Sequence, residues 1–112
     1  MKTKLLISLL LSAGLLAGCS EMNPHPMDMS QAVQSATSKT DHEALAKHYE
    51  AAAKDLQLKV EEHKKLLSQY QSKNYVYGKQ ADTLISHCRI LINAYEKAAE
   101  ANLSMAAMHR QM

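Results

Sequence analysis

The chain has 112 residues, of which 46% are hydrophobic and 21% are charged, and it contains no Trp and no Phe. This length allows one small domain, and five Tyr are too few for a large aromatic core. Three Gly and two Pro are too few for the many turns of a β-sandwich or β-barrel. The abundant Ala, Leu, Lys, Gln, Glu and Met favour helices, so the composition predicts an all-α fold.

The first residues have the pattern of an export signal. Lys2 and Lys4 precede an almost wholly apolar run from residue 5 to residue 16. A run of about 12 apolar residues is short for a bilayer span, and a basic start followed by such a run is typical of a secretory signal peptide. We therefore expect residues 1–18 to be a signal peptide, with a transmembrane anchor as the weaker alternative.

The sequence Leu16-Ala17-Gly18-Cys19 closes this apolar run. It resembles the lipobox of bacterial lipoproteins, in which Leu and two small residues precede a cysteine. The resemblance implies that Cys19 carries a covalent lipid, begins the mature chain and anchors it to a membrane. In the sorting rule of many Gram-negative bacteria, Asp after this cysteine favours the inner membrane. Ser20 therefore implies the outer membrane, on its periplasmic face.

Removal of the signal changes the charge and the number of free cysteines. The full chain has 13 Lys and Arg against 11 Asp and Glu, and loss of Lys2 and Lys4 leaves the mature chain neutral. A neutral domain gives no electrostatic reason to bind nucleic acid. Once Cys19 is lipidated, Cys88 has no partner within the chain. It is then either a buried apolar residue or the partner of a cysteine in a second chain, as an intermolecular disulfide.

Residues 19–39 show no sustained periodicity and contain two prolines, which predicts a flexible tether in which residues 31–38 could form a short helix. Thr40 and Glu43 fit a capping box at the start of a helix. Apolar residues then recur at helical spacing to about residue 71, and again from about residue 76 to 110. We expect residues 40–112 to form a two-helix antiparallel hairpin with its turn at residues 72–75.

The apolar stripe of each helix is too wide for one neighbouring helix to cover. We therefore expect two hairpins to pair into a four-helix bundle as a homodimer, or one hairpin to pack on another protein of the cell envelope. In outline the helical part resembles small helical lipoproteins of Gram-negative bacteria. That likeness assigns no functional residue.

The two helical segments contain a short repeat. Residues 49–64 and residues 95–110 both begin with Tyr-Glu, followed by an Ala-rich stretch, and both end with His and a basic residue. Tyr49 then corresponds to Tyr95, and His63 corresponds to His109. Duplication of one helix and chance alignment of two Ala-rich heptad patterns both explain this repeat. In either case we expect it to govern helix packing, with large Tyr side chains against small Ala side chains.

Four of the six histidines lie on or beside the apolar seams: His42, His63, His87 and His109. A turn centred on residues 74 and 75 places His63 opposite His87, and His42 opposite His109. Met105 lies one helical turn before His109. His, Met and Cys side chains bind copper and zinc, so these pairs are candidate metal sites. The structural alternative is that the histidines only pack at a helix interface.

The sequence does not predict an enzyme. Two helices offer almost no concave site at which an acid, a base and a nucleophile can converge. No Ser/His/Asp set, Gly-rich phosphate loop or CxxC motif is present. Neighbouring residues of a helix point about 100° apart, so His87 is poorly placed to activate Cys88. Two hypotheses remain: a lipid-anchored structural or interaction module, and a periplasmic copper or zinc binding protein.

Overall fold

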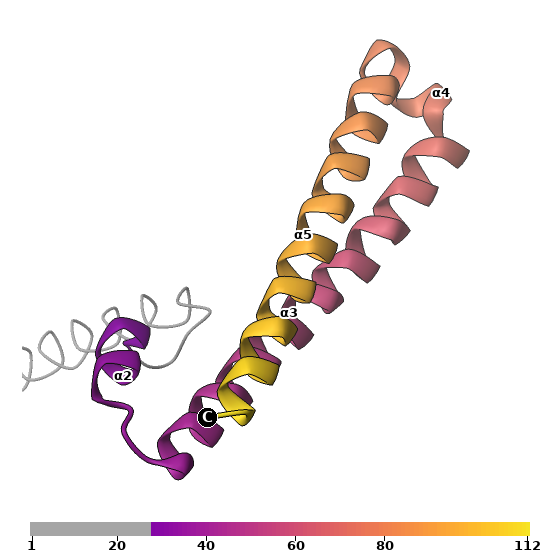
Figure 1. The fold of residues 1–112 in the computed structure, drawn as a ribbon. Coiled ribbons are helices and arrows are strands. Elements are labelled where there is room, and N and C mark those ends of the chain that lie inside the picture. The colour runs from indigo at the N-terminus through magenta and orange to yellow at the C-terminus, as the bar shows by residue number, and fades with distance from the viewer. Residues whose placement is uncertain (1–27) are drawn as a thin grey trace, which may run out of the picture.

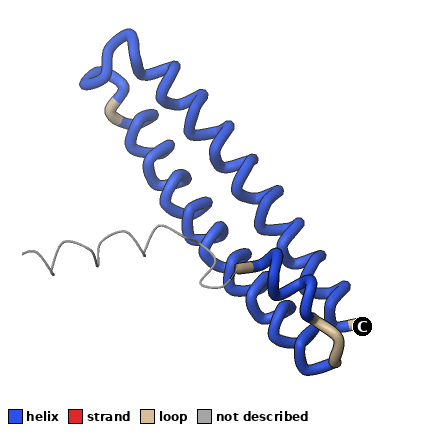
Figure 2. Tube along the Cα trace, turned by 90° about the vertical axis from the view of Figure 1, so that its left-hand side faces the viewer, coloured by secondary structure: helices blue, strands red, loops and turns tan. Residues whose placement is uncertain are grey.

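The computed structural model describes residues 28–112, and over this range it contains helices and no strands. In chain order the elements are α2 (Met29–Ser35), α3 (Lys39–Ser72), α4 (Asn74–Tyr77), the 3-10 turn η2 (Gly78–Gln80) and α5 (Ala81–Arg110). The two long helices lie side by side and run in opposite directions (Figure 1 and Figure 2). The prediction of an all-α protein whose long helices pair is confirmed.

The N-cap of α3 lies two residues before the predicted one. Ser38, not Thr40, is the N-cap: its hydroxyl accepts a hydrogen bond from the Asp41 amide at 3.1 Å. The Asp41 carboxylate accepts from the amides of Ser38 at 2.9 Å and Thr37 at 3.1 Å. Both Ser38 and Thr40 are followed three residues later by an acidic residue. The earlier box is used because Asp41 satisfies two free amides there.

The connection between the long helices is longer than predicted. The expected turn at residues 72–75 is replaced by Lys73, the four-residue helix α4 and the turn η2, so α5 begins at Ala81 and not at about residue 76. Gly78 makes the reversal with φ +54 and ψ −129, a conformation that residues with a side chain rarely adopt. The rings of Tyr70 and Tyr77 meet edge to face at this end, with a centroid distance of 4.9 Å and an interplanar angle of 78°.

The predicted tether is partly helical. Asp28 caps α2 by accepting hydrogen bonds from the amides of Ser30 and Gln31, and residues 36–38 connect α2 to α3. This helix lies close to the range that the sequence allowed for a short helix. The predicted signal peptide 1–18, the lipidated Cys19, Ser20 and the rest of the tether to residue 27 lie outside the described residues.

Small side chains form most of the contact between α3 and α5. Buried alanines recur on both helices: Ala46, Ala52, Ala53, Ala81, Ala99 and Ala106. Val60 and Cys88 are buried with them. Small residues at heptad spacing let two helix backbones approach closely. None of the helices between residues 28 and 112 combines the length and the apolar character that crossing a bilayer requires.

Candidate functional site

Two histidines meet at the end of the molecule where α3 begins and α5 finishes. The Nδ1 atom of His42 lies 3.1 Å from the Nδ1 atom of His109, with the ring planes inclined by 22°. The ring centres are 5.4 Å apart, so the two nitrogens face each other between the rings. This distance is that of an N–H···N hydrogen bond, in which one Nδ1 donates and the other accepts. The predicted meeting of His42 with His109 is therefore observed.

Tyr49 also packs against the ring of His109. The two rings are nearly parallel, at an interplanar angle of 10° and a centroid distance of 5.6 Å. His42 and Tyr49 are seven residues apart on α3, so His109 packs between two side chains of the same helix face. His109 is buried as a result, and His42 is half-buried.

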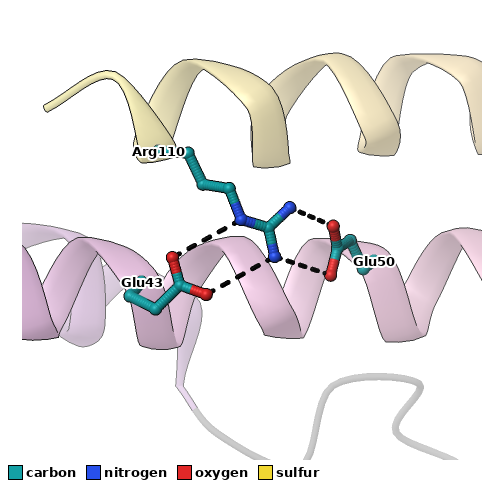
Figure 3. Close-up of polar contacts among 3 residues, drawn as sticks. All are labelled: Glu43, Glu50 and Arg110. Carbon is teal, nitrogen blue, oxygen red and sulfur yellow. Dashed lines mark hydrogen bonds and ion pairs between the residues drawn. The ribbon is translucent and has the colours of Figure 1, made fainter.

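Arg110 binds two carboxylates beside the histidine pair (Figure 3). Its guanidinium donates to Glu50, with Nη2 at 2.9 Å from Oε2, and forms an ion pair with Glu43, with Nε at 3.4 Å from Oε2. The hydrogen bond from Arg110 holds the pKa of Glu50 below its ordinary value, and the carboxylate of Glu50 in turn raises the pKa of Arg110. These contacts tie the last turn of α5 to α3.

The repeat found in the sequence has a structural counterpart. Tyr49 on α3 packs against His109 on α5, and Tyr95 on α5 packs against His63 on α3, at 5.5 Å. The neighbouring ion pairs follow the same relationship. Glu50 on α3 pairs with Arg110 on α5, and Glu96 on α5 pairs with Lys64 on α3 at 3.7 Å. The α3–α5 pair therefore has an approximate internal two-fold axis. The partner of each repeated Tyr is a His and not, as expected, only small Ala side chains.

The predicted pairing of His63 with His87 is wrong. His63 faces Tyr95, whereas His87 is exposed on the outside of α5. Tyr95 faces His63 in the same register in which Tyr49 faces His109, since the residue numbers of both pairs add to 158. In the register that joins His42 to His109, whose numbers add to 151, the residue opposite His63 is the buried Cys88. Its neighbour His87 points about 100° away around α5 and therefore lies outside the seam.

Cys88 is a free, buried thiol between the helices. Of the two alternatives left by the sequence, the structure places it as a buried small residue, and a disulfide to a second chain would require α3 and α5 to separate. By the two-fold relationship, Cys88 takes the position beside His63 that His42 takes beside His109. The Nδ1 atom of His63 is buried and has no hydrogen-bond partner among the described residues.

Sequence reasoning missed one buried histidine. His48 on α3 is buried, although it lies beside the predicted apolar rows and was assigned no role. Its signal was weak, because it lies outside the heptad positions that predicted the seam. Met105, a candidate ligand, lies one turn before His109 and is exposed. Over residues 28–112, no three or more His, Cys, Asp or Glu side chains are grouped as metal ligands.

An open groove follows the ion-paired side of the helix pair. Its volume is about 520 Å³, and its floor is small and apolar at Val60 and Ala99. Glutamates dominate its rim, and Lys64 is already paired there with Glu61 at 3.2 Å and with Glu96. Lys64 is therefore already ion-paired with a carboxylate on each of the two helices.

Comparison with known proteins finds no matching protein-family model, no matching curated protein and no matching solved structure. The described residues therefore have to be interpreted from their own geometry. That geometry offers two features with chemical consequences: the imidazole pair of His42 and His109, and the apolar surface that α5 does not bury against α3.

Proposed function

We propose that this protein is a lipid-anchored structural or interaction module of the bacterial envelope. In this proposal, Cys19 carries the lipid and Ser20 directs the protein to the periplasmic face of the outer membrane. The helix pair, held at the membrane by the segment that follows Cys19, is a hairpin that packs against a second copy of itself to form a four-helix bundle. The lipobox supports the anchor, and the exposed apolar surface of α5 supports the pairing.

The observation that carries the pairing is an apolar strip on α5. It consists of four residues spaced by seven, which lie on one side of the helix beside the row that contacts α3: Leu84, Leu91, Ala98 and Met105. Leu91 and Met105 remain 36% and 37% exposed. Leu84 and Ala98 are half-buried. A regular strip of this kind is what one edge of a four-helix bundle interface requires.

Sedimentation equilibrium of the full chain in density-matched detergent tests the pairing. We expect a dimer for the native sequence and a monomer for Leu91→Glu, because a charge in the strip would be buried without a partner. Ile90→Glu is the matched control. Ile90 is 59% exposed and adjacent to Leu91, but it lies outside the strip, so this variant stays dimeric. A native monomer at all concentrations would exclude self-pairing and leave the strip to a different envelope protein.

Membrane fractionation tests the anchor separately. Replacing Cys19 by Ala removes the thiol that would receive the lipid, so we expect the precursor to remain unprocessed and the lipidated form to disappear. Cys88→Ala is the control, since it removes the other cysteine and leaves the lipobox intact. Unchanged processing of Cys19→Ala would exclude a lipoprotein, whatever the oligomeric state of the helix pair.

A further inference from the structure

We propose that His42 and His109 together bind a divalent transition ion of the kind that imidazole ligates, with Zn²⁺ as the type case. This inference does not depend on the membrane anchor or on self-pairing. It rests on the facing Nδ1 atoms, on the packing that holds the two rings, and on the charges beside them.

The distance between the two nitrogens is close to the distance that zinc imposes. Two nitrogen ligands at 2.0–2.1 Å from a tetrahedral zinc ion lie about 3.3 to 3.4 Å apart. The Nδ1 atoms of His42 and His109 are 3.1 Å apart. An ion bound to both atoms lies beside the line that joins them. The nitrogens must therefore separate by about 0.2 to 0.3 Å, and each ring must turn by about 35°, for the ion to replace the shared hydrogen bond. The ring that donated its Nδ1 proton gives it to water and takes up a proton from water on Nε2, so both rings are neutral with the proton on Nε2 and no net proton is released.

The protein brings the two rings together before the ion arrives. His109 is buried and packed on Tyr49, and the next residue, Arg110, is tied to α3 by two glutamates. His42 is the fourth residue of α3, and its amide donates to the carbonyl of the N-cap residue Ser38 at 3.1 Å. A site whose two ligands already lie next to each other loses less conformational entropy on binding than a site whose ligands must first be brought together.

The charges next to the site tolerate a cation. Arg110 is adjacent to His109 and would repel a divalent ion, but Glu43 and Glu50 both pair with its guanidinium. The two carboxylates carry two negative charges against the single positive charge of Arg110, so the net charge of this cluster is negative. Two imidazoles supply half of a tetrahedral shell, so water completes the coordination and we expect an affinity in the micromolar range.

Isothermal titration of the full chain in detergent with ZnCl₂ tests the site. We expect one ion per chain, and at least about a tenfold weaker affinity in both His42→Ala and His109→Ala, since each removes one of two protein ligands. His63→Ala is the matched control because it deletes the two-fold equivalent of His109 and the same kind of Tyr stack, while leaving the pair intact. His87→Ala removes the exposed histidine. Both controls keep the native affinity.

Three results overturn the proposal: no binding of Zn²⁺ by the native chain at micromolar concentration, undiminished binding in His42→Ala and His109→Ala, or loss of binding in His63→Ala. Circular dichroism of each variant establishes that its helices are formed. Zinc K-edge absorption spectroscopy of the native complex gives an independent result that does not require a folded variant. Two imidazole ligands support the site, and one or none excludes it.

Discussion

Arg110 in the last turn of α5 is bound to Glu50, 60 residues earlier in α3. This contact joins the two ends of the helix pair that are farthest from the connection at residues 73–80. It also has an acid–base consequence, because the hydrogen bond from Arg110 is the main cause of the lowered pKa of Glu50.

The first prediction concerns this pKa. We expect Arg110→Gln to raise the pKa of Glu50 towards its ordinary value, measured by NMR titration of the carboxyl carbon. Since the pKa of Glu50 is lowered by folding, its stabilising contribution is present above the ordinary pKa and is lost as the pH falls through the lowered one. Arg110→Gln removes that acid sensitivity. Lys64→Gln, at the two-fold equivalent position, should leave Glu50 unchanged.

The second prediction separates the two capping boxes. Ser38→Ala should lower the free energy of unfolding by about 0.5 to 2 kcal/mol in urea denaturation, because the Asp41 amide loses its acceptor. Thr40→Ala should have almost no effect. The hydrogen bonds from Thr37 and Ser38 lower the pKa of Asp41, and Ser38→Ala should raise it. Equal effects of the two substitutions would contradict the observed start of α3.

The third prediction concerns the close approach of the long helices. Ala53 is 1% exposed and lies in the contact with α5, whereas Ala51 lies on the outside of α3. Ala53→Leu should destabilise the protein by about 1 to 3 kcal/mol, because the larger side chain forces the helices apart. Ala51→Leu adds the same atoms in solvent and should be nearly neutral. Thermal unfolding of both variants by circular dichroism makes the comparison.

The fourth prediction concerns the backbone of the connection. Gly78→Ala should cost about 1 to 3 kcal/mol in free energy of unfolding, because the positive φ strains any residue with a Cβ atom. A Cβ atom at this position would meet nothing within 4 Å, so the cost is conformational and not a clash. Lys79→Ala, the neighbouring control, should unfold like the native chain. A neutral Gly78→Ala would show that the connection adopts another conformation.

The fifth prediction concerns Cys88. The thiol is 5% exposed, so it should react with a thiol reagent only after denaturation, and non-reducing electrophoresis of the native protein should show no disulfide-linked dimer. Ser86→Cys places a thiol on the exposed side of α5 and should react at once. Rapid labelling of native Cys88 would mean that the helix pair opens readily.

Local sequence patterns predicted the helices well and their ends less well. The heptad spacing of Ala and Leu indicated both long helices, because one face of a helix must be apolar to pack. The start of α3 was placed two residues late, since Ser38 and Thr40 offer the same cap chemistry. The start of α5 was placed about five residues early, since α4 continues the helical periodicity on the other side of Gly78.

The histidine pairs show the same division between local and long-range information. The meeting of His42 with His109 was predicted correctly because both side chains lie on the seam face of their helices. His63 and His87 were predicted to pair by the same argument, but the seam residue is Cys88, and its neighbour His87 points away from the seam. The repeat shared by the two helices was visible in the sequence, but its meaning required the contacts of Tyr49 and Tyr95.

The sequence by itself determined that the chain is helical and that two long segments present apolar faces, and it predicts a lipoprotein-like signal at residues 1–19. These properties depend on residue type and spacing along the chain. Only the tertiary structure decided which side chains face each other across the seam, that Cys88 is buried, and that an approximate two-fold axis relates the two copies of the repeat. Register between two helices depends on the exact path of their connection, and a shift of a few residues there changes every long-range contact.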